Sequence, residues 1–178
     1  MTALEPGAFT VELPVVIRQA TRADLPQMEW YGQYAHYRNL YRRSFREQRE
    51  GKRILLVADC QDFPIGQIFI QLVSTNRRIA DGVSRAYLYS FRVMSMFQGR
   101  GVGTRLVQEA EAIVAARGFT TVTIAVAKDN VRALQLYERL DYRKFGEDPG
   151  RWQYVDHHGN TRSVHEPCWV LEKFLKLR

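Results

Sequence analysis

A glycine-rich segment, Gln98-Gly-Arg-Gly-Val-Gly-Thr104, joins two stretches of different pattern. The run before it, Arg85–Val93, is rich in aromatic and β-branched residues with partial alternation, which predicts a strand. Apolar residues then recur at helical spacing as far as Gly118, which predicts a helix with that glycine as its C-terminal cap. At a helix N-terminus the first N–H groups lack intrahelical partners and the dipole is positive, and glycine lets a ligand approach the backbone. The segment therefore predicts a binding site for a diphosphate.

Two other phosphate-binding motifs fit this segment poorly. A P-loop requires a lysine before the threonine, and Gly103-Thr104 has none. A dinucleotide-binding fingerprint starts almost directly at the strand end, whereas Met94–Gln98 intervene here, and its third glycine follows the second by three residues rather than two. A tight turn without a ligand is the remaining alternative, and the loop alone leaves it open.

A second segment of interest is Asn130-Val-Arg-Ala-Leu-Gln-Leu-Tyr-Glu-Arg-Leu-Asp-Tyr142. It follows a β-branched run, Thr120–Val126, which predicts another strand, and Asn130 is suited to cap a helix. The apolar side of that helix consists of Val131, Leu134, Leu140 and Tyr137. From the residues alone, Tyr137 could equally be a core tyrosine with a backbone partner for its hydroxyl.

The two segments carry a family resemblance. Val93, a four-residue spacer and Gln98–Gly103 resemble the acetyl-CoA signature of the GNAT superfamily of N-acetyltransferases, Arg/Gln-x-x-Gly-x-Gly/Ala. The second segment resembles the Asn-x-x-Ala-x-x-Leu-Tyr motif of that family, with Asp141-Tyr142 where Gly-Phe is more usual. The resemblance implies an α/β fold, namely a twisted mixed β-sheet flanked by helices in a single domain. Its central strands would splay apart to bind acetyl-CoA.

The resemblance also implies roles for individual residues. Backbone groups of Val93 and Ser95 would pair with the pantetheine arm, and an N–H near Val93 or Met94 would face the thioester carbonyl. Tyr137 would be the catalytic residue, protonating the departing thiolate. The cofactor-binding residues implied are Val93, Met94, Ser95, Gln98, Gly99, Arg100, Gly101, Val102, Gly103, Thr104, Asn130 and Tyr137. The cations near enough to be candidates for the 3′-phosphate are Arg100, Arg105, Lys128 and Arg132.

The general base is not evident in the sequence. Many family members carry a glutamate on the strand before the loop, at about the position of Tyr87 or Tyr89, and this strand has no carboxylate. A water chain or a distant glutamate can remove the proton of the amine, so the difference concerns mechanism more than activity. Three glutamates remain unranked candidates, namely Glu29, Glu47 and Glu166. No metal site is predicted, because His157, His158, His165 and Cys168 match no ligand spacing.

The rest of the chain must position these segments. We expect Met1–Leu13 to be a loose tail, followed by a single domain over residues 14–178. In the first third of the chain we expect a strand at Val15–Gln19, a short helix capped by Thr21 and a helical region at Met28–Glu50. A hairpin of Ile54–Ala58 and Ile65–Val73, with a bulge at Gly66, and a polar loop at Asn76–Ser84 should follow. The last two strands should begin at Tyr142–Phe145 and cover Pro167–Leu175, with a loop between them.

Composition restricts the class of protein. The chain has 178 residues, of which 46% are hydrophobic, and that suffices for a full core. It shows neither a secretory signal nor an apolar run near the ~18 residues of a membrane span, so we expect a cytoplasmic protein without a membrane partner. Two cysteines suit a reducing compartment.

The net charge of +7 does not separate the candidate functions, because a basic field attracts acetyl-CoA as well as nucleic acid. The favoured function is acetyl-CoA-dependent N-acetylation of a primary amine on a small molecule or protein. The alternative is a CoA-binding regulatory module without turnover, and a basic nucleic-acid-binding domain is a distant third. A homodimer is a candidate assembly, since dimers are the commonest oligomers. The resemblance implies that Met28–Glu50 and Glu147–Glu166 decide acceptor specificity. The tyrosines of the first segment could equally be core residues and its arginines a solvated helix face.

Overall fold

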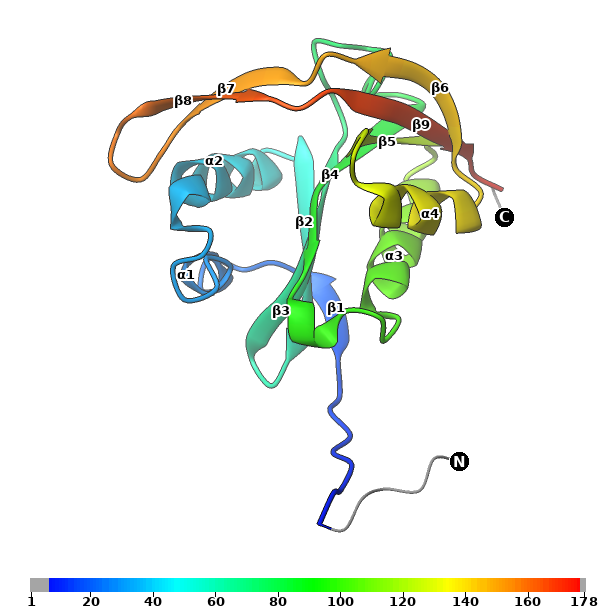
Figure 1. Cartoon of the computed structure of the whole chain (residues 1–178). Coiled ribbons are helices and arrows are strands. Elements are labelled where there is room, and N and C mark those ends of the chain that lie inside the picture. Colours follow the sequence, from blue (N-terminus) through cyan, green and yellow to red (C-terminus); the bar gives the residue numbers. More distant parts are fainter. Residues whose placement is uncertain (1–6, 177–178) are drawn as a thin grey trace.

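The computed structural model describes residues 7–176 as an α/β fold with a seven-stranded mixed sheet, in the order β1-β2-β3-β4-β5-β9-β6, and a separate hairpin of β7 and β8 (Figure 1). The strands are β1 (Val16–Gln19), β2 (Arg53–Cys60), β3 (Phe63–Gln71), β4 (Arg85–Val93), β5 (Thr121–Ala127), β6 (Arg143–Asp148), β7 (Arg151–Val155), β8 (Thr161–His165) and β9 (Cys168–Phe174). The helices are α1 (Asp24–Gln27), α2 (Arg38–Arg49), α3 (Val102–Ala116) and α4 (Val131–Arg139), with 3₁₀ turns η1 (Ala35–Tyr37) and η2 (Ser95–Phe97). The predicted fold class is confirmed.

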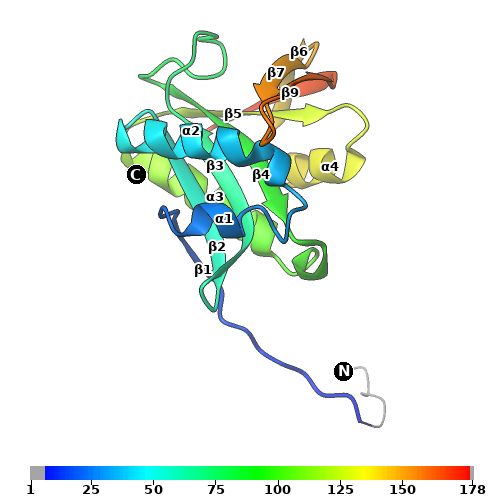
Figure 2. The same ribbon diagram turned by 90° about the vertical axis from the view of Figure 1, so that its left-hand side faces the viewer.

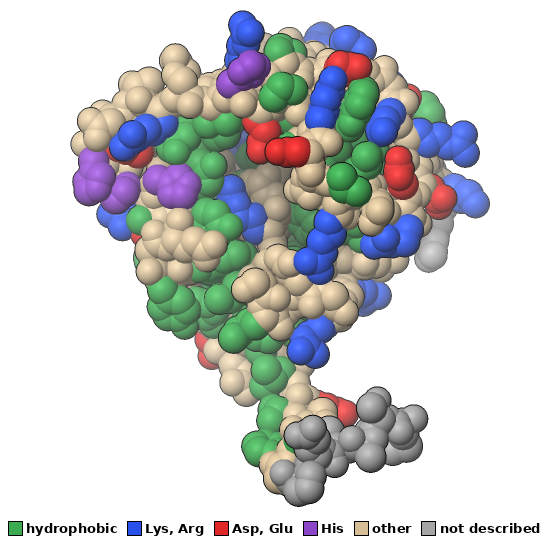
Figure 3. Space-filling view, viewed as in Figure 1, with side chains coloured by type: hydrophobic (Ala, Val, Ile, Leu, Met, Phe, Trp, Pro, Cys, Tyr) green, Lys and Arg blue, Asp and Glu red, His purple; other side chains and the backbone are tan. Residues whose placement is uncertain are grey.

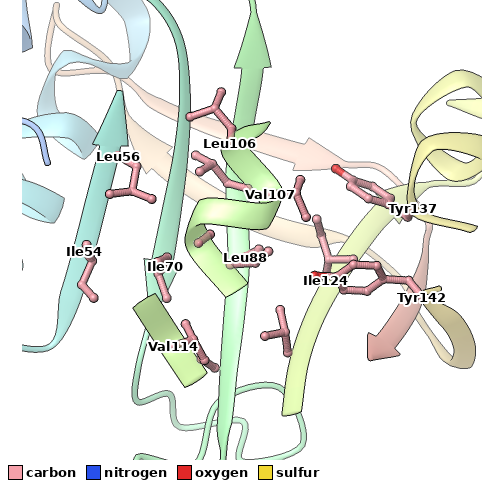
Figure 4. Close-up of a cluster of buried hydrophobic side chains, with 14 of the residues drawn as sticks. Ile54, Leu56, Ile70, Leu88, Leu106, Val107, Val114, Ile124, Tyr137 and Tyr142 are labelled. Carbon is pink, nitrogen blue, oxygen red and sulfur yellow. The ribbon is translucent and has the colours of Figure 1, made fainter. Parts of the chain in front are cut away.

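Helices cover both faces of the sheet. In Figure 1, α1 and α2 lie on one side of β2, β3 and β4, and α3 and α4 lie on the other. Alternation along β2 sends Leu55 and Val57 toward α2 and sends Ile54 and Leu56 into the larger core under α3. Figure 4 shows this larger core, where Leu106 and other residues of α3 meet apolar side chains from the sheet. Strands β2 and β3 are thus buried on both faces, which fixes the sheet relative to both helix layers.

The two central strands separate as the resemblance implies. β4 and β5 are parallel, but their ladder covers only four pairs and ends at Leu88 and Ile124. Beyond that point β4 continues to Val93 and β5 to Ala127, without pairing to each other. The ends of these strands therefore expose backbone groups that a ligand could pair with.

A bulge in β4 changes which face its side chains point to. Gln67 pairs with Arg92 and Phe69 with Tyr89, so β4 has one residue more than β3 in this interval. Ser90 has a φ of 52°, and the side chain of Gln67 donates to its carbonyl at 3.1 Å and its hydroxyl at 3.0 Å. After the bulge Phe91 packs on the α3 side, and Arg92 turns to the side of the α2 tyrosines.

The N-terminal half departs from the prediction in two places. The helical region expected at Met28–Glu50 is interrupted, because Trp30, Tyr31 and Gly32 all have positive φ and only η1 and α2 follow as helices. Thr21 does not cap α1. Its backbone N–H and hydroxyl instead donate to Asp24, at 2.6 and 2.9 Å. The expected bulge at Gly66 is confirmed by the register shift between β2 and β3.

Other expectations concern the ends of elements. Gly118 follows α3 with a φ of 85°, and Asn130 caps α4 by accepting from the N–H of Ala133 at 3.1 Å, both as predicted. Val131 is 56% exposed, so its place on the apolar side of α4 was wrong. Of the expected tail, residues 7–13 are exposed and outside any helix or strand, and residues 1–6 lie outside the described part (Figure 2). No helix within residues 7–176 is long and apolar enough to cross a membrane.

The loop expected between the last strands is instead the β7–β8 hairpin, whose tip packs near α2. Asn39 of α2 donates to the carbonyl of Asp156 at 2.7 Å. The Asp156 carboxylate accepts from the N–H groups of His158 and Asn160, both at 2.9 Å, and pairs with Arg162 at 2.7 Å. The Asn160 N–H and Arg162 lower the pKa of Asp156 to about 2. The sequence predicts a loop here, but it does not predict the two strands, which have only five residues each and are mostly exposed.

Gly150 closes the base of this hairpin, and its replacement by alanine is expected to destabilise the protein by about 3 kcal/mol. Its φ is 64°, and a Cβ would lie 1.7 Å from the carbonyl oxygen of Glu166. Gly159 at the tip is the matched control, because its φ is 84° with nothing within 4 Å, so Gly159→Ala should cost only about 1 kcal/mol. Urea unfolding measures both values. Equal losses would mean that the hairpin base adjusts freely to the added methyl group.

Candidate active site

A cavity of about 390 Å³ lies at the N-terminus of α3, between the end of β4 and α4. The α3 helix begins at Val102, with Gly101 as its N-cap at a φ of 82°, and the first intrahelical bond runs from Arg105 N–H to Gly101 C=O at 3.0 Å. The N–H groups of Val102, Gly103 and Thr104 therefore have no partners within the helix. Together with the helix dipole they make this end of the cavity suited to an anion.

Seven of the twelve predicted cofactor-binding residues line this cavity, namely Val93, Gln98, Gly99, Gly101, Gly103, Thr104 and Asn130. Gln98 connects its walls, because its amide donates to the carbonyl of Val93 at 2.9 Å and accepts from Arg132 at 2.7 Å. The Oδ1 atom of Asn130 caps α4, and the amide nitrogen of that side chain donates to no residue among 7–176, so it can donate to a ligand.

The other five predicted residues, namely Met94, Ser95, Arg100, Val102 and Tyr137, do not line the wall of this cavity. Val102 is buried in the larger core, and the side chain of Met94 packs against that core. Ser95 starts η2 and is exposed, and Arg100 donates to the carbonyl of Met96 at 3.3 Å. The ring of Tyr137 packs against that of Phe91, with 6.1 Å between the ring centroids.

The backbone at the end of β4 distinguishes the two expected N–H donors. The N–H of Met94 donates to the carbonyl of Ile65 at 2.8 Å, so it is already paired within the sheet. Gly66 pairs with Val93 in the register, and successive N–H groups along a strand point to opposite edges. The N–H of Val93 therefore points away from β3, toward the edge that β5 has left.

Tyr137 is 3% exposed and packs among Phe91 and Tyr142. In Figure 4 its hydroxyl points away from Tyr142, toward the space between β4 and β5. Burial, and secondarily the neighbouring Tyr87, raise the pKa of Tyr137. The hydroxyl therefore remains protonated throughout the neutral range, as a proton donor must.

A second cavity, of about 510 Å³, lies on the other face of β4, bounded by α2 and by β6, β7 and β9. Figure 3 shows this face hollowed between the part of the molecule that carries α2 and the part that carries α4. Six aromatic side chains line the cavity, namely Tyr37, Tyr41, Phe69, Tyr87, Tyr89 and Trp152. Tyr37 and Tyr41 come from the predicted tyrosine row of the helical region. Tyr34 lies in the first cavity instead, and Tyr31 is 89% exposed.

Arg92 lines both cavities, and sequence reasoning missed it. Its guanidinium lies 4.4 Å from the ring centroid of Tyr34 and 4.8 Å from that of Tyr37, and Nη1 donates to the hydroxyl of Tyr41 at 3.0 Å. Strict alternation along the strand would have put Arg92 on the same face as Leu88, so only the bulge at Ser90 reveals its direction. Arg139 and Leu136 were also missed, although their spacing from Arg132 on α4 is helical and could have indicated them.

The three glutamates that are candidates for the general base lie in different surroundings. Glu29 pairs with Arg38 at 2.6 Å and lines neither cavity. Glu47 pairs with Arg43 at 2.9 Å and with Arg53, and these cations lower its pKa against the effect of burial. Glu166 lines the second cavity together with Asp148, which the sequence interpretation did not name.

Of the four cations predicted as candidates for the 3′-phosphate, Arg132 lines the first cavity, as Arg139 also does. Lys128 instead pairs with Glu147 at 2.6 Å and stacks on Trp169. Arg100 and Arg105 are exposed and do not line it. No three His, Cys, Asp or Glu side chains gather into a group that could hold a metal ion anywhere in the part of the chain that the structure describes.

Known proteins are similar to this chain in sequence and in fold. The acetyltransferase (GNAT) family model matches residues 18–142. The chain is 37% identical over 92 residues to N-alpha-acetyltransferase 40 of Saccharomyces cerevisiae, a match that spans 46% of this chain and 32% of that protein. The chain thus matches about a third of the length of this curated relative.

Two solved structures superpose on most of the chain. The ribosomal-protein-S18-alanine N-acetyltransferase of Escherichia coli has a TM-score of 0.68 at 17% identity, over 93% of this chain and 96% of that one. Arabidopsis thaliana NAA60 in complex with acetyl-CoA has a TM-score of 0.68 at 15% identity, over 91% and 99%. Identities this low show the fold alone, whereas the family model covers more than half of the sequence. The chain therefore belongs to the acetyltransferase (GNAT) family.

Proposed function

We propose that the protein transfers the acetyl group of acetyl-CoA directly to a primary amine of a small molecule or a protein. The observation that carries the proposal is that two cavities on opposite faces of β4 meet at its bulge, where Arg92 lines both. Direct transfer requires a thioester and an amine to approach each other at one point, and this junction provides it. The similarity to N-alpha-acetyltransferase 40 supports an α-amino group as the acceptor.

The first cavity would hold acetyl-CoA. The unpartnered N–H groups of Val102, Gly103 and Thr104 would bind the pyrophosphate, and Arg132 and Arg139 would complement the remaining negative charge. The N–H of Val93 would pair with the pantetheine arm or face the thioester carbonyl, where such a donor contributes about 3 kcal/mol to the stability of the oxyanion. The carbonyl of Val93 is held by Gln98, which a ligand would have to displace.

Proton transfer would involve groups on both sides of β4. Tyr137 would donate to the departing thiolate, since burial raises its pKa and keeps the hydroxyl protonated. Burial likewise raises the pKa of Tyr87 and Tyr89, so neither can act as a base near neutral pH. Glu166 or Asp148 would accept the proton of the amine, directly or through water.

Two alternatives and two further properties remain open to test. A CoA-binding module without turnover would bind acetyl-CoA but release no thiol with any amine, and a nucleic-acid-binding domain would be retained on DNA in a salt-dependent manner. We also propose a cytoplasmic location, which the free cysteines Cys60 and Cys168 support. A homodimer stays a prediction that light scattering can check.

Acetyl-CoA is expected to raise the unfolding temperature of the protein by roughly 5 to 11 °C at about 100 times its Kd. The reason is that a ligand which binds only the folded state adds about 2.7 kcal/mol at that concentration. Differential scanning fluorimetry measures the shift, with NADH and ATP as controls. No shift at millimolar acetyl-CoA would contradict the proposed function.

A further inference from the structure

We infer that the acceptor is a free α-amino acid with an apolar or aromatic side chain, whose carboxylate is bound by Arg92. This inference rests on the proposed function and names the substrate class of the second cavity. Its starting observation is a guanidinium that lines both cavities and pairs with no carboxylate among residues 7–176.

The partners of Arg92 are all neutral. Nη1 donates to the hydroxyls of Tyr41, at 3.0 Å, and Ser90, at 3.3 Å, and two tyrosine rings flank the guanidinium. Among residues 7–176 Arg92 forms no ion pair. A guanidinium has five N–H donors in a planar fork, so the Nε and Nη2 side remains available for two parallel bonds to a carboxylate.

Arg92 differs in this from the other partly buried arginines of the sheet. Arg18 pairs with Asp24 and Asp59, Arg53 pairs with Glu47, and Arg85 pairs with Glu172. A partly buried cation without an acid is unfavourable unless something supplies the missing charge. At the wall of a cavity, a ligand anion can supply it.

The place of Arg92 restricts the distance between the two polar groups of the acceptor. The amine must reach the thioester at the same junction, so amine and carboxylate have to lie within a few bonds of each other. An α-amino acid meets this condition, and a diamine or a long ω-amino acid does not. In a peptide substrate an amide replaces that carboxylate, and Arg92 would then lack its counter-ion.

The remaining walls suit the other parts of such a molecule. The aromatic side chains of the cavity, Tyr87 and Trp152 among them, offer an apolar surface for the substituent on the α-carbon. Asp148 and Glu166 lie on the β6 and β9 side, where they would attract the incoming ammonium. Figure 3 shows acidic side chains at the upper rim of the hollow and basic ones deeper within it. The cavity of about 510 Å³ is in the range of small-molecule sites.

The test compares three amines that differ only in the carboxyl group, namely L-phenylalanine, L-phenylalaninamide and phenethylamine. Thiol release with saturating acetyl-CoA gives kcat/KM for each. We expect phenylalanine to exceed both others by about 100-fold or more, since a site that bonds a polar group of its substrate rejects analogues which leave its own polar group unpaired. Equal turnover of the three amines, or a preference for phenylalaninamide, would overturn the inference.

Variants assign the preference to Arg92. In Arg92→Met the ratio of kcat/KM for phenylalanine to kcat/KM for phenethylamine should shrink to a few-fold, because only phenylalanine has a carboxylate that Arg92 could bind. Arg151→Met is the matched control, because Arg151 lines the same cavity but is exposed, and it should keep the full preference. A preference that survives in Arg92→Met would also overturn the inference.

Different results would contradict the amino-acid acceptor and the acetyltransferase activity. If calorimetry detects acetyl-CoA binding and peptide or diamine acceptors release thiol while phenylalanine does not, the α-amino acid is wrong and the proposed function stands. If acetyl-CoA does not bind at all, the proposed function fails and the acceptor inference fails with it. Arg92→Lys, which keeps the charge but not the fork, covers the case in which the methionine variant does not fold.

Discussion

Replacing Gly101 with glutamate is expected to weaken acetyl-CoA binding by at least about 100-fold, because like charges placed together cost several kcal/mol. Gly101 precedes α3 with a φ of 82°, and nothing lies within 4 Å of the position of its Cβ, so a longer side chain would extend into the cavity. Its carboxylate would repel the diphosphate and would itself accept from the free N–H groups of α3. Isothermal titration calorimetry with acetyl-CoA measures the loss.

Gly51→Glu is the matched control for this substitution. Gly51 has a φ of 74°, is equally open, and lies just after α2, outside both cavities. Both variants place a glutamate in the left-handed region, so they should lose similar stability, but only Gly101→Glu should lose acetyl-CoA. If Gly101→Glu binds with unchanged affinity, the glycine segment is only a turn and the phosphate site must be abandoned.

The second large effect is expected at Tyr137, where phenylalanine should lower kcat by about 100-fold, the lower end of what proton transfer by a positioned side chain contributes. The Kd of acetyl-CoA should stay nearly unchanged, because the substitution removes only a hydroxyl group and keeps the ring that packs against Phe91. Burial raises the pKa of the hydroxyl above its ordinary value of about 10, so the wild-type activity should not fall through loss of this proton below that pH. Steady-state kinetics across pH measures both effects.

Tyr142→Phe separates catalysis from packing. Tyr142 is also buried, touches Tyr137 at a centroid distance of 5.9 Å, and donates its hydroxyl to Glu111 at 2.8 Å. Loss of that bond should destabilise the fold by about 1 to 3 kcal/mol while kcat is retained. Equal activity of Tyr137→Phe and wild type would make Tyr137 a core tyrosine, the alternative that its sequence left open.

The elements that carry strong local signals were predictable. The helix after the glycines, with Gly118 beyond its end, and the helix capped by Asn130 both follow from patterns within a few residues. Periodicity and capping are local properties, and they act before any long-range contact forms. The helical region at Met28–Glu50 failed for the opposite reason. Its tyrosines and arginines have helical spacing, but Trp30 and Tyr31 adopt positive φ, and the indole of Trp30 donates to the carbonyl of Pro64 at 2.7 Å.

The β7–β8 hairpin, which bounds the second cavity, also could not be predicted from local sequence. Its strands have five residues each and are mostly exposed, so they give a weaker signal than a longer and half-buried strand. Its position depends on Asn39, which is 117 residues away from Asp156 in the chain. A contact between residues so far apart leaves no pattern in the sequence near either of them. The sequence therefore predicts only a loop for the segment that completes the wall of the second cavity.

The sequence by itself determined the family, the helix that starts after the glycines and the place of Tyr137 after the second central strand, because glycine, capping and apolar spacing are readable along a single segment. Only the tertiary structure decided which groups face each other. The bulge at Ser90 shifts the alternation of β4 by one residue, and this shift turns Arg92 toward the tyrosines and brings it to both cavities. The physical reason is that the direction of a strand side chain follows from its register with a neighbouring strand, and the register is a property of pairing between distant segments.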